Sequence, residues 1–137
     1  MNDATTGTWA RGISALTIFA EDLAAMRAFY GEVVGARLVM SDSESAAYAV
    51  GSVIVNVLRV ESAGELIEPA PVGPAGTPTR IMPTIDVDDV DAVCERLRSA
   101  GIALLNGPMD RPWGVRTAAF RDPAGHVWEI AQPVRRG

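Results

Sequence analysis

The 137-residue chain has very little cysteine and histidine, with one residue of each, Cys94 and His126. A single cysteine excludes an internal disulfide framework and is typical of proteins in a reducing compartment. A single histidine also excludes a metal centre built from several histidines of one chain. The scarcity of cysteine favours a cytoplasmic protein.

Several other common features are missing. No apolar run reaches the length of a membrane span, and the start, MNDATTGTWARG, lacks the basic region and apolar core of a secretory signal. The net charge is −5, so there is no excess of positive charge to bind phosphates. Gly-rich phosphate loops, cysteine pairs for zinc and Gly-x-Ser-x-Gly nucleophile motifs are also absent. We therefore expect neither nucleic acid nor a membrane as a partner.

The composition is that of a globular protein, with 48% hydrophobic and 21% charged residues. Its apolar spacing predicts a strand, a helix and three strands, a Pro/Gly-rich linker, and then the same order again. Asp22 and Asp89 are predicted helix N-caps, and Gly35 and Gly101 predicted helix ends. The predicted strands are 13–20, 36–40, 46–50, 53–60, 80–87, 102–105, 115–120 and 126–131.

The two halves align at an offset of 67 positions, which places Thr17 on Thr84 and Asp22 on Asp89. A strand–helix–three-strand unit cannot bury its sheet alone, so two copies must close over a shared core. The sequence predicts an α+β fold in one domain, 1–137. It would hold two βαβββ modules, at about 12–60 and 80–133, joined by a linker at 61–79.

Two motifs add a family resemblance to this repeat. The helix ending in AFYGEVVGA and the C-terminal FRDPAGHVWEI resemble the vicinal-oxygen-chelate superfamily over residues 12–133. That superfamily includes glyoxalase I, bleomycin-resistance proteins, fosfomycin-resistance enzymes and extradiol dioxygenases. The resemblance implies a curved, mixed-sheet cleft and a homodimer, with modules that pair either within or between chains.

The resemblance also implies four positions for metal ligands, on the first and last strand of each half. They correspond to Ala15, Asn56, Met82 and Glu129. Alanine has no donor atom, a thioether suits copper(I), and an amide is a poor ligand for zinc, nickel or iron(II), so only Glu129 retains a suitable group. We therefore expect a vestigial metal site and no cofactor. The alternative is a divalent metal whose ligands lie elsewhere.

Strand parity predicts the residues that would line the cleft instead. Apolar and small side chains alternate there with a few polar ones, which is the composition of a small-molecule pocket. Trp113, in the loop RPWG, would form an aromatic wall over it. The predicted lining consists of Ala15, Thr17, Phe19, Asn56, Met82, Thr84, Asp86, Trp113 and Glu129.

Individual polar residues admit more than one interpretation. Glu129 would bind a basic group, act as a general base, or simply face solvent. Arg111 and Arg116 would either clamp an anion or form surface salt bridges. Surface salt bridges are the more common role of such arginines. His126 is interpreted as structural within its turn, and Cys94 as a packed or half-exposed thiol.

Three functions are consistent with these features. The first is a metal-free protein that binds a small, partly apolar molecule in its cleft. The second is an enzyme: a metal-dependent lyase or dioxygenase, or a metal-free isomerase with Glu129 or Asp86 as base. The third is an interaction domain without a small-molecule ligand. We rank them in this order.

Overall fold

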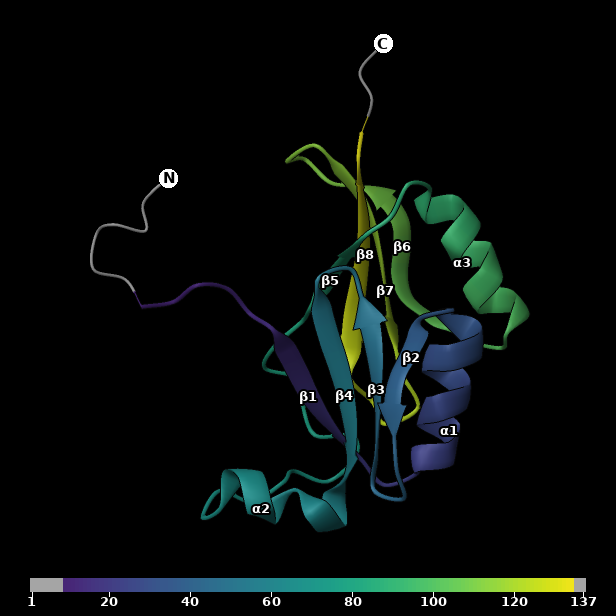
Figure 1. The fold of residues 1–137 in the computed structure, drawn as a ribbon. Coiled ribbons are helices and arrows are strands. Elements are labelled where there is room, and N and C mark those ends of the chain that lie inside the picture. Colours follow the sequence, from purple (N-terminus) through teal and green to yellow (C-terminus); the bar gives the residue numbers. More distant parts are fainter. Residues whose placement is uncertain (1–8, 135–137) are drawn as a thin grey trace.

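The computed structural model describes residues 9–134, which form the predicted order of elements twice (Figure 1). The first half contains β1 (Ala15–Ala20), α1 (Leu23–Ala28), η1 (Phe29–Val33), β2 (Arg37–Ser41), β3 (Ser45–Val50) and β4 (Val53–Arg59). The connection contains η2 (Val60–Ser62) and α2 (Gly64–Ile67). The second half contains β5 (Thr84–Asp86), α3 (Val90–Ser99), β6 (Leu104–Asp110), β7 (Val115–Arg121) and β8 (Val127–Pro133).

The strands form two four-stranded mixed sheets of equivalent topology, in the orders β1-β4-β3-β2 and β5-β8-β7-β6. In each sheet the first and last strands of the half pair in parallel, and the other neighbours pair antiparallel. The α+β class with tandem βαβββ modules is therefore confirmed. The two sheets remain separate and do not close into a barrel.

Both main helices begin as the sequence predicts. Asp22 Oδ1 accepts a hydrogen bond from the Ala25 N–H at 3.0 Å, and Asp89 Oδ1 accepts one from the Ala92 N–H at 3.1 Å. The first helix differs in its second part, where α1 continues as the π-helical segment η1. This segment buries two aromatic side chains, Phe29 and Tyr30.

A single hydrophobic core joins the two halves. The Phe29 ring lies 6.1 Å from that of Phe120, and the Tyr30 ring lies 6.2 Å from that of Trp128, so η1 contacts the second sheet. In Figure 1, α3 lies above α1 on the same side of the molecule, and Arg96 Nη2 of α3 donates to the Glu32 carbonyl at 3.1 Å. Both sheets turn their helix-covered faces toward this core. We call the opposite face of each sheet its open face.

Three segments differ from the secondary structure predicted from the sequence: residues 80–87, residues 106–114 and the linker 61–79. The predicted strand 80–87 is reduced to β5, because Pro83 has no N–H for the ladder; its carbonyl accepts from Glu129 N–H at 2.9 Å. The predicted loop 106–114 is partly strand, because β6 continues to Asp110 through register shifts. Gly107 permits this: its φ is +82°, and a Cβ there would lie 2.5 Å from the Thr117 carbonyl oxygen.

The predicted linker is not wholly irregular, since it contains α2. Within residues 9–134, no helix combines the length and apolar character needed to cross a membrane. Trp9, in the N-terminal segment, is 90% exposed.

Candidate functional site

Glu129 lies on the open face of the second sheet. Its neighbours Trp128 and Ile130 point into the shared core, so strand alternation places the carboxylate on the opposite side. Thr84 Oγ1 donates a hydrogen bond to Glu129 Oε1 at 2.9 Å. Glu129 is half-buried, and its cross-strand neighbour Ala119 is small. The carboxylate is thus held in place by Thr84, next to the small and buried side chain of Ala119.

The register aligns these residues in a row that crosses all four strands. The row runs Thr84, Glu129, Ala119, Asn106. The adjacent row, Asp86, Ala131, Thr117 and Met109, is parallel to it. The central positions of the two rows hold two alanines, Ala119 and Ala131, and two polar side chains, Glu129 and Thr117.

Arg111 connects the two rows. Its Nε donates to Thr117 Oγ1 at 2.9 Å, and its Nη2 donates to Asn106 Oδ1 at 3.2 Å. Thr117 is buried, so this bond satisfies a polar group that would otherwise lack a partner. The guanidinium lies 6.0 Å from the ring centroid of Trp113. We call Thr84, Asn106, Arg111, Trp113, Thr117 and Glu129 the Glu129 cluster.

The first-half residues predicted for the cleft lie on the other sheet. Thr17 and Asn56 are register partners on β1 and β4, and Ala15 is two residues before Thr17. Ala15 and Thr17 are exposed and Asn56 is half-buried. Because both sheets turn their helix-covered faces to one core, the predicted lining is divided between two open faces rather than gathered in one cleft of the chain.

The remaining predicted residues lie in four places. Thr84 and Asp86 line a cavity of about 310 Å³ at the edge of β5, whereas Phe19 lines a different cavity beside His126. Met82 is 46% exposed, just before β5, and Trp113 is 70% exposed in the β6–β7 turn. Trp113 borders the Glu129 cluster through Arg111.

The residues at the four family positions do not fit a divalent metal. Within the part of the chain that the structure describes, no three His, Cys, Asp or Glu side chains lie close enough together to hold an ion. Ala15 offers no donor atom, and Asn56 and Met82 offer weak ones. His126 directs its Nδ1 to Asp122, at 2.9 Å from Oδ2. We therefore derive no chemical step through a metal.

Arg116 and Cys94 lie away from the open face. Arg116 donates from Nε and Nη2 to both Asp91 oxygens at 3.0 Å, and from Nη1 to Asp110 Oδ1 at 2.9 Å. These bonds join β7 to α3 and to β6, so Arg116 is a salt-bridge residue and not a ligand clamp. Cys94 is buried in the core, and this burial raises the pKa of its thiol.

A buried network around the β7–β8 turn was not predicted from the sequence. Tyr30 Oη donates to Asp122 Oδ2 at 2.6 Å, and His126 Nδ1 lies 2.9 Å from the same oxygen. Burial by itself would raise the pKa of Asp122, but the hydrogen bonds from His126 and Tyr30 outweigh it and keep that pKa below its ordinary value. Burial, together with the charge of Asp122, raises the pKa of Tyr30. The available signal was an aspartate and a histidine four residues apart in DPAGH.

These features define a class: tandem βαβββ proteins with two open sheets on one core and a polar cluster on the second. The family model described as "Glyoxalase/Bleomycin resistance protein/Dioxygenase superfamily" matches residues 12–130. The chain therefore belongs to this superfamily. An uncharacterized protein of Mycobacterium bovis is 40% identical over 72 residues, which are 53% of this chain and 45% of that protein. The match thus spans less than half of that relative.

Two solved structures are also similar. A glyoxalase-related enzyme from Fulvimarina pelagi has a TM-score of 0.78 and 29% identity, covering 89% of this chain and 88% of its own. An antibiotic-binding protein from a Streptomyces species has a TM-score of 0.70 and 26% identity, covering 92% of this chain and 98% of its own. The solved structures similar to this chain thus include both an enzyme and a binding protein.

Proposed function

We propose that this protein binds a small, partly apolar molecule on the open face of its second sheet, without a metal. The observation that carries the proposal is the placement of Glu129. A half-buried carboxylate, oriented by Thr84 at 2.9 Å, stands beside the small side chain of Ala119. Few, well-placed polar groups on an apolar surface are the usual composition of a ligand site.

The cluster favours a ligand with an aromatic body and a donor or cationic group. Glu129 Oε1 accepts from Thr84, and no residue within 9–134 donates a hydrogen bond to the second carboxylate oxygen. The exposed Trp113 ring offers a stacking surface beside the Arg111 guanidinium. The similarity to an antibiotic-binding protein supports a ligand of this kind.

We further propose that a second copy of the chain covers the open faces. Several large apolar side chains on or beside them are exposed: Met40 by 68%, Met82 by 46% and Ile13 by 70%. Exposed apolar surface of this kind marks interaction sites. In such a homodimer the first sheet of one copy would lie opposite the Glu129 cluster of the other, forming the cleft between chains. Light scattering at micromolar concentration should give a dimeric mass, and a monomeric mass would contradict this arrangement.

The binding proposal is tested by thermal shift and calorimetry with metal-free bleomycin and a panel of aromatic, cationic antibiotics. A ligand at about 100 times its Kd should stabilise the protein by about 2.7 kcal/mol. Glu129→Gln should weaken binding of a cationic ligand about tenfold or more, because it removes a charge-assisted hydrogen bond. Glu65→Gln, in the exposed α2, is the matched control and should bind like the wild type.

A metal assay completes this experiment. The protein is offered nickel, zinc, manganese and iron(II), dialysed, and analysed for bound metal per chain. Near-zero occupancy for all four metals is expected from the donor set. Near-unit occupancy that Glu129→Gln abolishes would overturn the metal-free proposal and favour the lyase or dioxygenase alternative. If the Glu129→Gln and wild-type proteins bind every ligand with equal affinity, Glu129 is not part of the binding site.

A further inference from the structure

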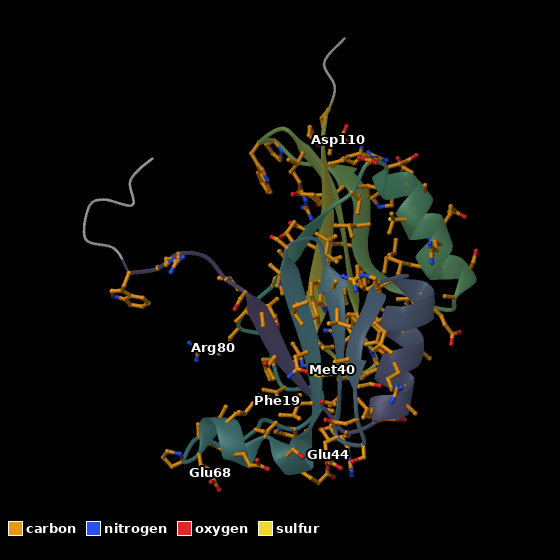
Figure 2. The ribbon with its side chains drawn as sticks, in the orientation of Figure 1. Phe19, Met40, Glu44, Glu68, Arg80 and Asp110 are labelled. Atoms are coloured by element: carbon orange, nitrogen blue, oxygen red, sulfur yellow. The ribbon has the colours of Figure 1, made fainter. Side chains whose placement is uncertain are left out.

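A second cavity, which we call the linker pocket, lies at the opposite end of the molecule from the β6–β7 turn. Figure 2 shows Phe19 and Glu68 near one end of the molecule and Asp110 at the other. The linker pocket has a volume of about 260 Å³ and is enclosed by the end of β1, residues 72–81 and the β7–β8 turn. Its walls include the apolar side chains of Phe19, Val72, Pro74 and Pro78. The volume suits a single-ring molecule.

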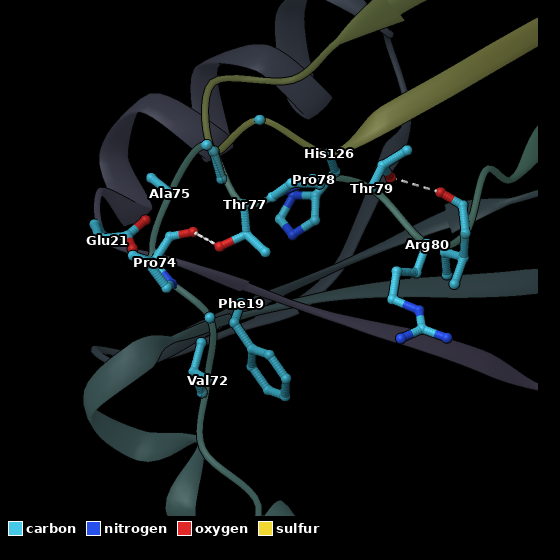
Figure 3. Close-up of a pocket in the computed structure, with 15 residues that line it drawn as sticks. Phe19, Glu21, Val72, Pro74, Ala75, Thr77, Pro78, Thr79, Arg80 and His126 are labelled. Carbon is cyan, nitrogen blue, oxygen red and sulfur yellow. Dashed lines mark hydrogen bonds between the residues drawn. The ribbon is translucent and has the colours of Figure 1, made fainter.

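His126 is one of the few polar side chains in this pocket. Figure 3 shows its ring among the lining residues, close to Thr77 and Pro78 and on the same side as Phe19. The Thr77 hydroxyl already donates to the Pro74 carbonyl, and the Thr79 hydroxyl donates to the Ile81 carbonyl. Glu21 and Arg80 stand at opposite sides of the pocket (Figure 3). The His126 imidazole is therefore the polar group at the centre.

The network behind His126 fixes which ring nitrogen carries a proton. Asp122 Oδ1 accepts from the Ala124 and His126 N–H groups at 2.9 and 3.0 Å, and Oδ2 accepts from Tyr30 Oη at 2.6 Å. The carboxylate side chain has no exposed surface. An ionised carboxylate can only accept hydrogen bonds, so the His126 nitrogen facing it, Nδ1, must be the donor. Neutral His126 then presents Nε2 as an acceptor.

We propose that the linker pocket is a separate binding site for a small phenol, whose hydroxyl donates a hydrogen bond to Nε2 of His126. The apolar walls would contact the aromatic ring, and the fixed imidazole would select molecules that carry a donor. Asp122 orients His126 as the acid of a catalytic triad orients its histidine: the carboxylate accepts from one ring nitrogen, and the other nitrogen is left to accept a proton. The proposal is independent of the Glu129 cluster, which lies on another part of the molecule.

The experiment is a nuclear magnetic resonance titration of the full chain with phenol, anisole and benzoate. Phenol should shift the amide signals of Gly76, Thr77 and Gly125 and the ring signals of His126, with a Kd on the order of 1 mM for so small a probe. Anisole has the same ring but no donor, and it should bind about tenfold more weakly. Benzoate tests for an anion site, and its binding more tightly than phenol would overturn the phenol proposal.

Two variants complete the test. His126→Asn retains a donor for Asp122 but removes the Nε2 acceptor, so it should fold and lose at least about tenfold in phenol affinity. Glu129→Gln should bind phenol as the wild type does, because the linker pocket is separate from the Glu129 cluster. Equal affinity for phenol and anisole, an unchanged affinity in a folded His126→Asn variant, or no saturable binding would each overturn the proposal. None of these outcomes tests the separate proposal that a ligand binds at the Glu129 cluster.

Discussion

The open faces of the two sheets carry corresponding rows of residues that differ at two positions. The first sheet aligns Thr17, Asn56, Ala47 and Met40 across its four strands. The second aligns Thr84, Glu129, Ala119 and Asn106. The threonine and the alanine recur, whereas an amide and a thioether in the first row are replaced by a carboxylate and an amide in the second. The two halves share one architecture, but the row of the second half carries a carboxylate that the row of the first half lacks.

The turns that join the last two strands of each half also differ, and the turn of the second half again carries more polar groups. The β3–β4 turn is short and contains Gly51 at a φ of +57°. The β7–β8 turn contains Asp122, whose side chain is buried beneath Tyr30 and His126. The first turn only reverses the chain, but the second also fastens it to η1. The second turn therefore adds a polar connection between the two halves to the shared hydrophobic core.

Asp122→Ala should have the largest effect on stability. The substitution leaves the buried Tyr30 hydroxyl and two backbone N–H groups without their acceptor. We expect a loss of about 3 kcal/mol in the free energy of unfolding, measured by urea denaturation at one fixed protein concentration. Ser52→Ala in the exposed β3–β4 turn is the matched control, with an expected change within about 0.5 kcal/mol. A similar small loss for both variants would show that the two turns do not differ in this way.

Asp122→Asn should have a smaller effect, which depends on pH. The hydrogen bonds lower the pKa of Asp122 in the folded protein below its ordinary value of 3.8. A lowered carboxyl pKa contributes stability above the unfolded-state value, and this contribution is lost as the pH falls through the folded-state pKa. Below about pH 4 the wild type should therefore lose unfolding free energy more steeply than Asp122→Asn. Urea denaturation at several pH values measures both slopes, and parallel curves would contradict the assignment.

Much of the fold could be predicted because it depends on short-range patterns. The alternation of Leu16 and Ile18 with Thr17, and the N-caps Asp22 and Asp89, are local features, and the structure confirms them. The length of β6 could not be predicted. The chain passes through Gly107, a residue that normally indicates a turn, and the reason is the close approach of the Thr117 carbonyl on another strand.

Of the candidate site, only the features that depend on local sequence patterns could be predicted. Strand parity places Glu129 opposite Trp128, but its bond to Thr84 joins residues 45 positions apart and depends on the parallel register of β5 and β8. The bond between Tyr30 and Asp122 spans 92 positions. It follows from the way η1 packs on the second sheet, which no local pattern encodes. The division of the predicted cleft between two open faces has the same origin.

Arg116→Gln should have the smallest of the three effects. Both helices bury apolar side chains in the core, and α3 is in addition joined to β7 and β6 by Arg116, which pairs with Asp91 and Asp110. Salt weakens an exposed ion pair but not an aromatic contact. The variant should lose less stability than either Asp122 substitution at low salt, and the difference from the wild type should vanish near 1 M NaCl.

Thermal unfolding at both salt concentrations measures this, with Arg98→Gln as the control. Among the residues that the structure describes, Arg98 pairs within its own helix, with Glu95 at 2.7 Å, so its loss should leave the docking of α3 unchanged. If the Arg116→Gln deficit persists at high salt, the contribution of Arg116 comes from packing of the arginine stem rather than from its charge. The two helices would then be fastened by the same kind of contact, and the contrast between the halves would be confined to the open faces and the turns.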